Sequence, residues 1–271
     1  MLSKKMAGLL VLAALPSLAQ VQARPDASPA TKALAPRQHA PMRLHGYTPS
    51  GSVTSENWSG FAVTGSSFTS AKGSWIVPSV NCSVTPSTYS SFWVGIDGYS
   101  SSTVEQTGTD SDCSGRTARY YAWYEFYPAG SILISSVAVS PGNKMSASVT
   151  YSGSQFTVTI TNVTTGKSFS KTGRVSGARR TSAEWIAEAP CCTGSGGILP
   201  LADFGTVDLG GDYTGVSGTN DATAGSISGP IKTFGSNVFS ITMVSSSGAQ
   251  EAVPSALSSD GTSFDVVWKS E

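Results

Sequence analysis

The sequence predicts an all-β fold, and three observations support this prediction. Apolar and small polar residues alternate with a period of two over 145–151 and again over 156–160, as expected for strands with one buried face. Ser, Thr and Gly are abundant and cluster between such runs, which is typical of sandwiches and barrels built from many short strands. Beyond the N-terminal apolar run, no segment combines a helical period with the length of a helix.

The strands can be placed in order along the chain. The runs 145–151 and 156–160 flank a Ser-Gly-Ser turn at 152–154 and predict a hairpin. A second turn at 164–167 leads into a strand that begins at 168–170, and 239–243 and 264–268 supply late strands. No internal repeat is present. We therefore expect a β-sandwich.

The N-terminus has the features of a secretory signal peptide over residues 1–23. Lys4 and Lys5 precede an apolar run over 6–18, and small residues ending at Ala23 form a cleavage site. The run is too short to span a bilayer comfortably, although an uncleaved membrane anchor is the alternative. We expect a secreted protein with no membrane contact once the signal is removed.

Residues 24–53 differ from the rest in being basic, proline-containing and without hydrophobic patterning. We interpret them as a pro-segment, with a plain linker as the alternative. Both histidines of the chain, His39 and His45, lie here. Residues 54–271 are expected to form the β-sandwich domain, which is long enough to bury a sizeable core.

The net charge of zero conceals an uneven distribution of charge. Of 17 Lys+Arg, two lie in the signal and four in 24–53, which leaves 11, whereas 16 of 17 Asp+Glu remain, so the domain carries about −5 (11 minus 16). A basic leader can bind an acidic domain at neutral pH and loosen as carboxylates become protonated. This makes the pro-segment a candidate inhibitor released by acid. Nucleic acid is not an expected partner, because no basic patch remains in the domain.

Four cysteines remain, and in an exported chain an even number indicates disulfides. We favour a Cys82–Cys113 bridge, which would hold the segment that carries Gln106. Cys191 and Cys192 would then pair with each other or stay reduced. No metal or other cofactor is expected, because histidine ligands and a C-x-x-C spacing are both missing from the domain.

The chemistry of the domain is narrowed by elimination. Without histidine beyond residue 53, neither a Ser-His-Asp triad nor a Cys-His pair can form. Carboxyl, amide, tyrosine and lysine side chains remain for acid–base work. Several acids lie between residues 97 and 125 among many aromatic residues, a pattern that fits either a cleft for a polymer or an ordinary core with polar rims.

Short motifs favour the cleft. Five of them occur in the following order: Asn57-Trp58-Ser59-Gly60, Trp93-Val94-Gly95-Ile96-Asp97-Gly98, Gln106-Thr107-Gly108, Ala122-Trp123-Tyr124-Glu125 and Ala183-Glu184-Trp185-Ile186-Ala187-Glu188. Together they resemble the glutamic peptidase (eqolisin) family of secreted acid proteases. The resemblance runs from about residue 54 to the C-terminus and is strongest over 93–126 and 181–188.

The resemblance implies a concanavalin-like or jelly-roll-like sandwich of two antiparallel sheets that curve around a substrate cleft. It assigns the catalytic pair to Gln106 and Glu188, the second acid of its motif. It also implies that five further residues wall the cleft or support the pair through hydrogen bonds: Trp93, Asp97, Asp110, Trp123 and Glu125. In this sequence Tyr121 stands where fungal members often have an acid, which leaves substrate preference and pH optimum open but not the reaction type.

Strand geometry agrees with this assignment without selecting one acid. If 184–188 is extended, Glu184 and Glu188 share a face, and a structural role near the rim is our interpretation of Glu184. Gln106 lies opposite Glu105, which we expect to be solvated. The implied activity is that of a monomeric acid endopeptidase acting on protein or peptide substrates. A jelly-roll glycoside hydrolase and a secreted carbohydrate-binding sandwich are the alternatives.

Overall fold

The computed structural model describes residues 37–48, 52–191 and 197–271. Its strands are β1 (Leu44–Tyr47), β2 (Val53–Ser55), β3 (Trp58–Thr64), β4 (Phe68–Ile76), β5 (Ser91–Ile96), β6 (Val104–Ser114), β7 (Thr117–Tyr127), β8 (Ile132–Ile134), β9 (Lys144–Ser152), β10 (Gln155–Asn162), β11 (Lys167–Gly173), β12 (Ser182–Glu188), β13 (Thr206–Leu209), β14 (Asp221–Ala224), β15 (Ile227–Pro230), β16 (Val238–Val244), β17 (Gln250–Pro254) and β18 (Phe264–Trp268). Two short helical segments, α1 (Gly211–Thr214) and η1 (Ile231–Asn237), accompany them. The predicted all-β class is confirmed.

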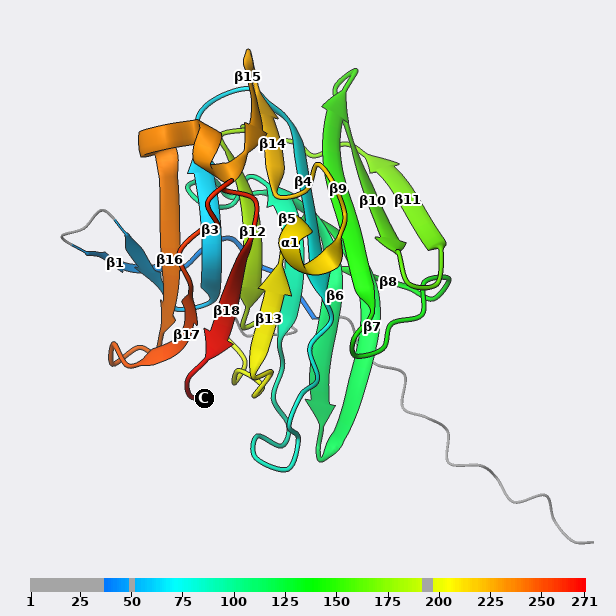
Figure 1. Cartoon of the computed structure of the whole chain (residues 1–271), viewed down its shortest axis with the longest axis vertical. Helices are drawn as coiled ribbons and strands as arrows, with labels where there is room; N and C mark the ends of the chain where they lie inside the picture. Colours follow the sequence, from blue (N-terminus) through cyan, green and yellow to red (C-terminus); the bar gives the residue numbers. More distant parts are fainter. Residues whose placement is uncertain (1–36, 49–51, 192–196) are drawn as a thin grey trace, which may run out of the picture. The chain divides into compact units, whose positions relative to one another are not determined.

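The strands form two layers (Figure 1). In one layer β2, β16, β3, β12, β5, β6, β7 and β8 pair in that order, and all pairs are antiparallel except β2 with β16. In the other, β11, β10, β9 and β4 pair in order, and β4 continues to β13 and β14. β13, β18 and β17 lead back to β16, so hydrogen bonds link both layers.

The predicted hairpin at 145–160 is confirmed as β9 and β10, with Val149 opposite Val158. Gly153 and Ser154 have φ values of 57° and 63°, as a two-residue turn with two left-handed positions requires. The predicted late strands coincide with β16 and β18.

A large hydrophobic core lies between the layers, and alternation decides which residues enter it. On β12, Ala183, Trp185 and Ala187 belong to this core, so Glu184, Ile186 and Glu188 point to the opposite face. The indole N–H of Trp185 donates to the carbonyl of Lys72 at 2.7 Å, which satisfies a buried donor.

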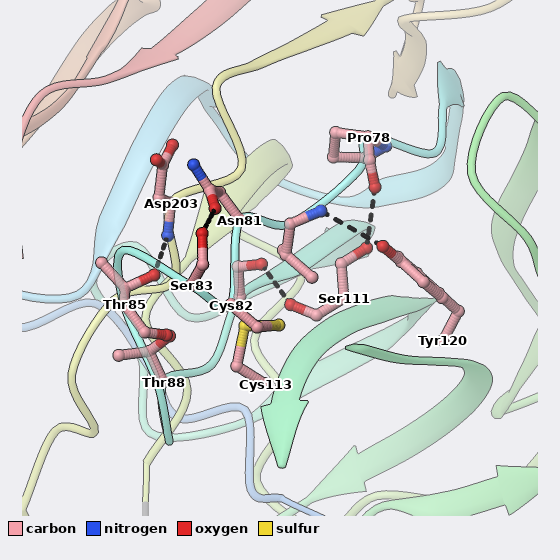
Figure 2. The surroundings of a disulfide bond; sticks show 12 residues. Pro78, Asn81, Cys82, Ser83, Thr85, Thr88, Ser111, Cys113, Tyr120 and Asp203 are labelled. Atoms are coloured by element: carbon pink, nitrogen blue, oxygen red, sulfur yellow. Dashed lines mark hydrogen bonds between the residues drawn. A yellow bond between two sulfur atoms is a disulfide. The ribbon is translucent and has the colours of Figure 1, made fainter. Parts of the chain in front are cut away.

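The predicted disulfide joins Cys82 and Cys113, with their Cα atoms 5.3 Å apart. It attaches the loop before β5 to the end of β6, and Figure 2 shows the hydrogen bonds of this loop around it. The Thr88 carbonyl accepts from the Cys113 backbone at 2.8 Å, beside the bridge. Cys191 is buried, and its predicted partner, Cys192, lies outside the described residues.

Part of the predicted pro-segment packs on the domain. β1 pairs with β2, and Val53 and Ser55 of β2 are fully buried. The expected boundary at residue 54 therefore falls within β2, although strand pairing does not show where a chain is processed. The predicted signal peptide, residues 1–23, lies outside the described residues. None of the helices in the described part of the chain has the length and apolar character to cross a membrane.

Candidate active site

The predicted site residues other than Asp97 lie on the face of the β12–β5–β6–β7 layer that points away from the large core, called here the site face. Three rows of residues cross these four strands on that face. They are Glu184, Gly95, Gln106 and Glu125; then Ile186, Trp93, Gly108 and Trp123; then Glu188, Ser91, Asp110 and Tyr121. Gln106 and Glu188 thus lie in the outer rows, on strands that flank β5.

Gln106 is fully buried and held from the neighbouring strand. Its side-chain N–H₂ donates to Glu125 Oε2 at 3.0 Å, and Glu125 is its direct partner in the β6–β7 register. Its Oε1 has no hydrogen-bond partner among the described residues. The amide is therefore oriented by one carboxyl group while an acceptor remains for another molecule.

Trp93 occupies the middle row and reaches Glu188. Its indole Nε1 donates to Glu188 Oε2 at 2.8 Å. A Cβ atom on Gly108 would lie 2.4 Å from the Phe92 carbonyl oxygen and 2.5 Å from Trp93 Cβ. Only glycine permits this close approach, which explains the glycine of the Gln-Thr-Gly motif.

The structure also brings His39 of the predicted pro-segment into this site. Its imidazole stacks on Trp123 with ring centroids 3.6 Å apart and an interplanar angle of 5°. Its Nδ1 lies 3.2 Å from Glu188 Oε2, and its Nε2 lies 3.9 Å from Asp110 Oδ1. The side chain is 1% exposed.

The backbone of His39 contacts the same groups. Its carbonyl oxygen accepts from Gln106 Nε2 at 2.6 Å, and its N–H donates to Glu125 Oε2 at 3.0 Å. His39 therefore contacts both members of the predicted catalytic pair, one through its main chain and the other through its ring.

Neighbouring leader residues are held mainly through their backbone. Gln38 exchanges two backbone hydrogen bonds with Cys191, at 3.1 and 2.8 Å. The Ala40 carbonyl accepts from Trp58 Nε1 at 3.1 Å, and the Met42 N–H donates to the Gly98 carbonyl at 3.0 Å. Residues 38–42 therefore lie on the site face as an extended peptide would.

Asn57 adds a side-chain clamp to this segment. Its Nδ2 donates to the Pro41 carbonyl at 3.2 Å, and its Oδ1 accepts from the Arg43 N–H at 2.7 Å. Two residues of the Asn-Trp-Ser-Gly motif, Asn57 and Trp58, thus contact the leader.

Burial controls the protonation of the site. It raises the pKa of Glu188 well above the usual value, and the neighbouring Glu125 charge adds to the shift. It also raises the pKa of Glu125, and it raises the pKa of Asp110 to about 6. Burial lowers the pKa of His39 well below 6.5. With residues 37–43 on the site face, burial thus shifts each of these groups toward its neutral form.

Asp112 and Arg37 extend this polar region. The Tyr121 hydroxyl donates to Asp112 Oδ2 at 2.7 Å. At a position where the family resemblance leads us to expect an acidic residue, the tyrosine thus binds the carboxyl group of another residue. Burial raises the pKa of Asp112, and the positive charge of Arg37 opposes the shift. The Arg37 guanidinium lies 4.1 Å from the Tyr89 ring centroid.

Asp97 has a role that the motifs did not reveal. Its carboxylate accepts from the backbone N–H groups of Arg179, Arg180 and Thr181 at 2.8, 2.6 and 2.9 Å. These residues lead directly into β12. Asp97, with φ of 70°, therefore anchors the loop that leads to Glu188, and its hydrogen-bond partners are residues 179–181 rather than Gln106 or Glu188.

The expectation that Glu105 is solvated is wrong. Its side chain is fully buried, because it points from β6 toward the core side. Burial and the Asp97 charge raise its pKa to about 9. Glu184, expected near the rim, is also fully buried, and burial raises its pKa.

The sequence analysis did not place part of the predicted pro-segment in this site. Residues 37–43 show no apolar periodicity, and many of their contacts are made by backbone groups, which any sequence could supply. Within 37–48, 52–191 and 197–271, no three His, Cys, Asp or Glu side chains are arranged to hold a metal ion.

Comparison with known proteins places the chain in a family. The model of the Peptidase A4 family matches residues 56–253. The chain belongs to the Peptidase A4 family. The predicted resemblance to glutamic peptidases is thereby confirmed.

Two curated Peptidase A4 relatives are similar in sequence. Aspergillopepsin-2 of Aspergillus niger is 32% identical over 189 residues, and scytalidopepsin B of Scytalidium lignicola is 34% identical over 177. The alignments cover 61% and 63% of this chain and 66% of each relative. The chain thus spans just under two thirds of their lengths.

Solved structures agree with this assignment. Scytalido-glutamic peptidase with a transition state analog inhibitor superposes with a TM-score of 0.66 and 27% identity, over 79% of this chain and 98% of that one. Aspergilloglutamic peptidase from Aspergillus niger gives 0.56 and 30%, over 67% and 99%. These neighbours support the predicted sandwich.

Proposed function

We propose that this chain is the precursor of a secreted acid endopeptidase in which Gln106 and Glu188 hydrolyse peptide bonds. One observation carries the proposal: the carbonyl oxygen of His39 already accepts a hydrogen bond from the Gln106 amide at 2.6 Å, and the ring of the same residue contacts the Glu188 carboxyl group. A substrate carbonyl in the same place would have its oxygen against an amide donor and its carbon within reach of a water on Glu188.

In the proposed reaction, ionised Glu188 accepts a proton from a water that attacks the scissile carbonyl carbon. The Gln106 N–H₂ stabilises the developing oxyanion, and its Oε1 helps to orient the water. Glu188 then gives the proton to the leaving nitrogen, so one carboxyl group acts as base and then as acid. Glu125 and Trp93 act by positioning Gln106 and Glu188.

The acidic working range follows from the proposed base. A carboxyl group with an ordinary pKa of about 4.3 is partly ionised in mildly acidic solution. With the leader bound, burial holds the pKa of Glu188 well above that value. Release of the leader would restore water and bring the pKa down, so removal both opens the site and generates the ionised base.

The leader is proposed to be the inhibitor of its own domain. Its extended segment occupies the site, and its basic Arg37 faces Asp110 and Asp112. Cleavage of the 1–23 signal would give a secreted, monomeric zymogen. On acidification we expect N-terminal shortening to a point near residues 46–56, and this step should require Glu188. A stable full-length form at low pH would contradict this part of the proposal.

Digestion of denatured globin at about pH 4, where glutamate is partly ionised in water, tests the proposal. We compare the wild-type chain with Gln106→Ala and Glu188→Gln. Loss of digestion in both variants supports the Gln–Glu pair. Retained digestion in Gln106→Ala would overturn it.

The alternatives predict other products. A glycoside hydrolase would release reducing sugar from a polysaccharide without proteolysis, and a carbohydrate-binding sandwich would do neither. The family assignment favours the peptidase over both, since the match covers the strands that carry Gln106 and Glu188.

A further inference from the structure

A leader that lies across a peptidase site must avoid being cut as a substrate. Backbone groups of Gln38, Ala40 and Met42 are hydrogen-bonded to the domain, as those of a bound substrate would be. The His39 carbonyl oxygen accepts a hydrogen bond from Gln106, so the peptide bond between His39 and Ala40 already has the contact that would stabilise the oxyanion. Hydrolysis of this bond also needs a water bound to Glu188.

The His39 ring takes the place of that water. A general base must approach its water to about 2.6–3.2 Å, and two protein atoms lie at that distance from Glu188 Oε2: His39 Nδ1 at 3.2 Å and Trp93 Nε1 at 2.8 Å. The indole belongs to the domain, so the imidazole is the group at this oxygen that the pro-segment supplies, and it stacks on Trp123 with ring centroids 3.6 Å apart. Oε1 of the same carboxyl group has no hydrogen-bond partner among the described residues.

We propose that the His39 side chain converts the leader from a substrate into an inhibitor by occupying the position of the attacking water between Glu188 and the His39 carbonyl. This inference rests on the proposed function, because it uses Gln106 and Glu188 as the catalytic pair. It assigns inhibition to one ring rather than to the basic charge of the leader.

The remaining contacts would hold the backbone after the ring is removed. Gln38 stays bonded to Cys191, the Ala40 carbonyl to Trp58 and the Met42 N–H to Gly98. Asn57 still clamps Pro41. None of these contacts uses the imidazole, so a shorter side chain at position 39 leaves space for water while the peptide keeps its place.

The experiment is the full-length His39→Ala variant, incubated in mild acid and analysed by mass spectrometry. Water should add to the carbonyl carbon of residue 39, and the bond to the Ala40 nitrogen should break. Glu188 passes the proton from water to that nitrogen. We expect a new N-terminus at Ala40 that wild type does not give, and we expect the added Glu188→Gln change to remove it.

His45→Ala is the matched control, because His45 is the other histidine of the chain and contacts Glu56 rather than the site. It should give no cut before Ala40. Cleavage of His39→Ala only at other bonds, or none at all, would overturn the inference. His39→Ser provides a second small side chain with the same expected product if the alanine variant folds poorly.

Globin digestion separates this inference from the proposed function. Residue 39 leaves with the leader, so the processed enzymes from the variant and from wild type should digest globin equally. Normal digestion without a cut before Ala40 would refute the role of His39 alone. Absence of digestion by processed wild type would refute the peptidase itself.

Discussion

The side-chain amide of Gln106 donates to the carbonyl oxygen of His39 at 2.6 Å, although 67 residues separate them in sequence. The same nitrogen donates to Glu125 Oε2 at 3.0 Å. One amide thus joins the sandwich to a segment that precedes it. Through this contact, the site face already binds a peptide segment of the same chain.

Glu125→Ala should weaken catalysis by the processed enzyme. Without Glu125, one Gln106 N–H loses its buried partner and the amide is free to rotate, at a cost of about 1–3 kcal/mol. We expect kcat to fall by about 10–100-fold with little change in KM. Glu125→Gln, which keeps an acceptor oxygen, should recover most of the loss. An unchanged kcat in the alanine variant would contradict the positioning role.

Trp93→Phe should move the acidic limb of the pH–rate profile upward. The indole N–H favours ionised Glu188, so its removal raises the pKa of Glu188, and the base becomes protonated at a higher pH. We expect a shift of about one pH unit in kcat. Trp75→Phe is the control, because the Trp75 N–H donates to Thr109 in the core. Equal profiles for both variants would count against a special role for Trp93.

Stability should fall as pH rises, with Glu105 as a contributor. The folded-state pKa of Glu105 is about 9, against an ordinary value of 4.5. The folded state therefore binds its proton more tightly, and the stabilisation is complete below 4.5 and is lost as pH rises toward 9. Urea unfolding between these values should show a slope that Glu105→Gln reduces by up to about 1.4 kcal/mol per pH unit.

Glu271→Gln, at an exposed position, should leave that slope unchanged. If the free energy of unfolding of wild type is constant between mild acid and neutral pH, the assignment of a protonated Glu105 is wrong.

Asp97→Ala should destabilise the fold more than it impairs the chemistry. Three backbone N–H groups at 179–181 would lose a buried acceptor. We expect the free energy of unfolding to fall by about 2–5 kcal/mol. Asp97→Asn is the matched variant, since asparagine tolerates the positive φ of this residue and keeps one acceptor oxygen. It should lose less. Similar unfolding curves for all three proteins would exclude the anchoring role.

Sequence patterns predicted the fold well, and most of the site residues that they proposed lie on one face of one layer. Period-two alternation identified β9, β10, β16 and β18, since one buried face imposes that period. The ordered motifs predicted that Gln106 and Glu188 belong together, and register pairing places both on the site face.

Three features could not be predicted, for different reasons. The role of Asp97 depends on backbone donors more than 80 residues away, which no local pattern encodes. The burial of Glu105 could not be predicted because alternation assigns a side chain to a face without saying whether water reaches that face. His39 lies in a segment held by its main chain, so its surroundings left no hydrophobic signal.

The Cys82–Cys113 disulfide helps to fix the register in which β6 pairs with its neighbouring strands. Cys113 lies on β6, the strand that carries Gln106, and its bridge attaches the end of that strand to a loop of the same layer. A slip of one residue along β6 would turn Gln106 inward and present Glu105 and Thr107 to the peptide instead. A covalent link at the end of the strand opposes such a slip. The disulfide thus helps to ensure that Gln106, and not a neighbouring side chain, faces the scissile bond.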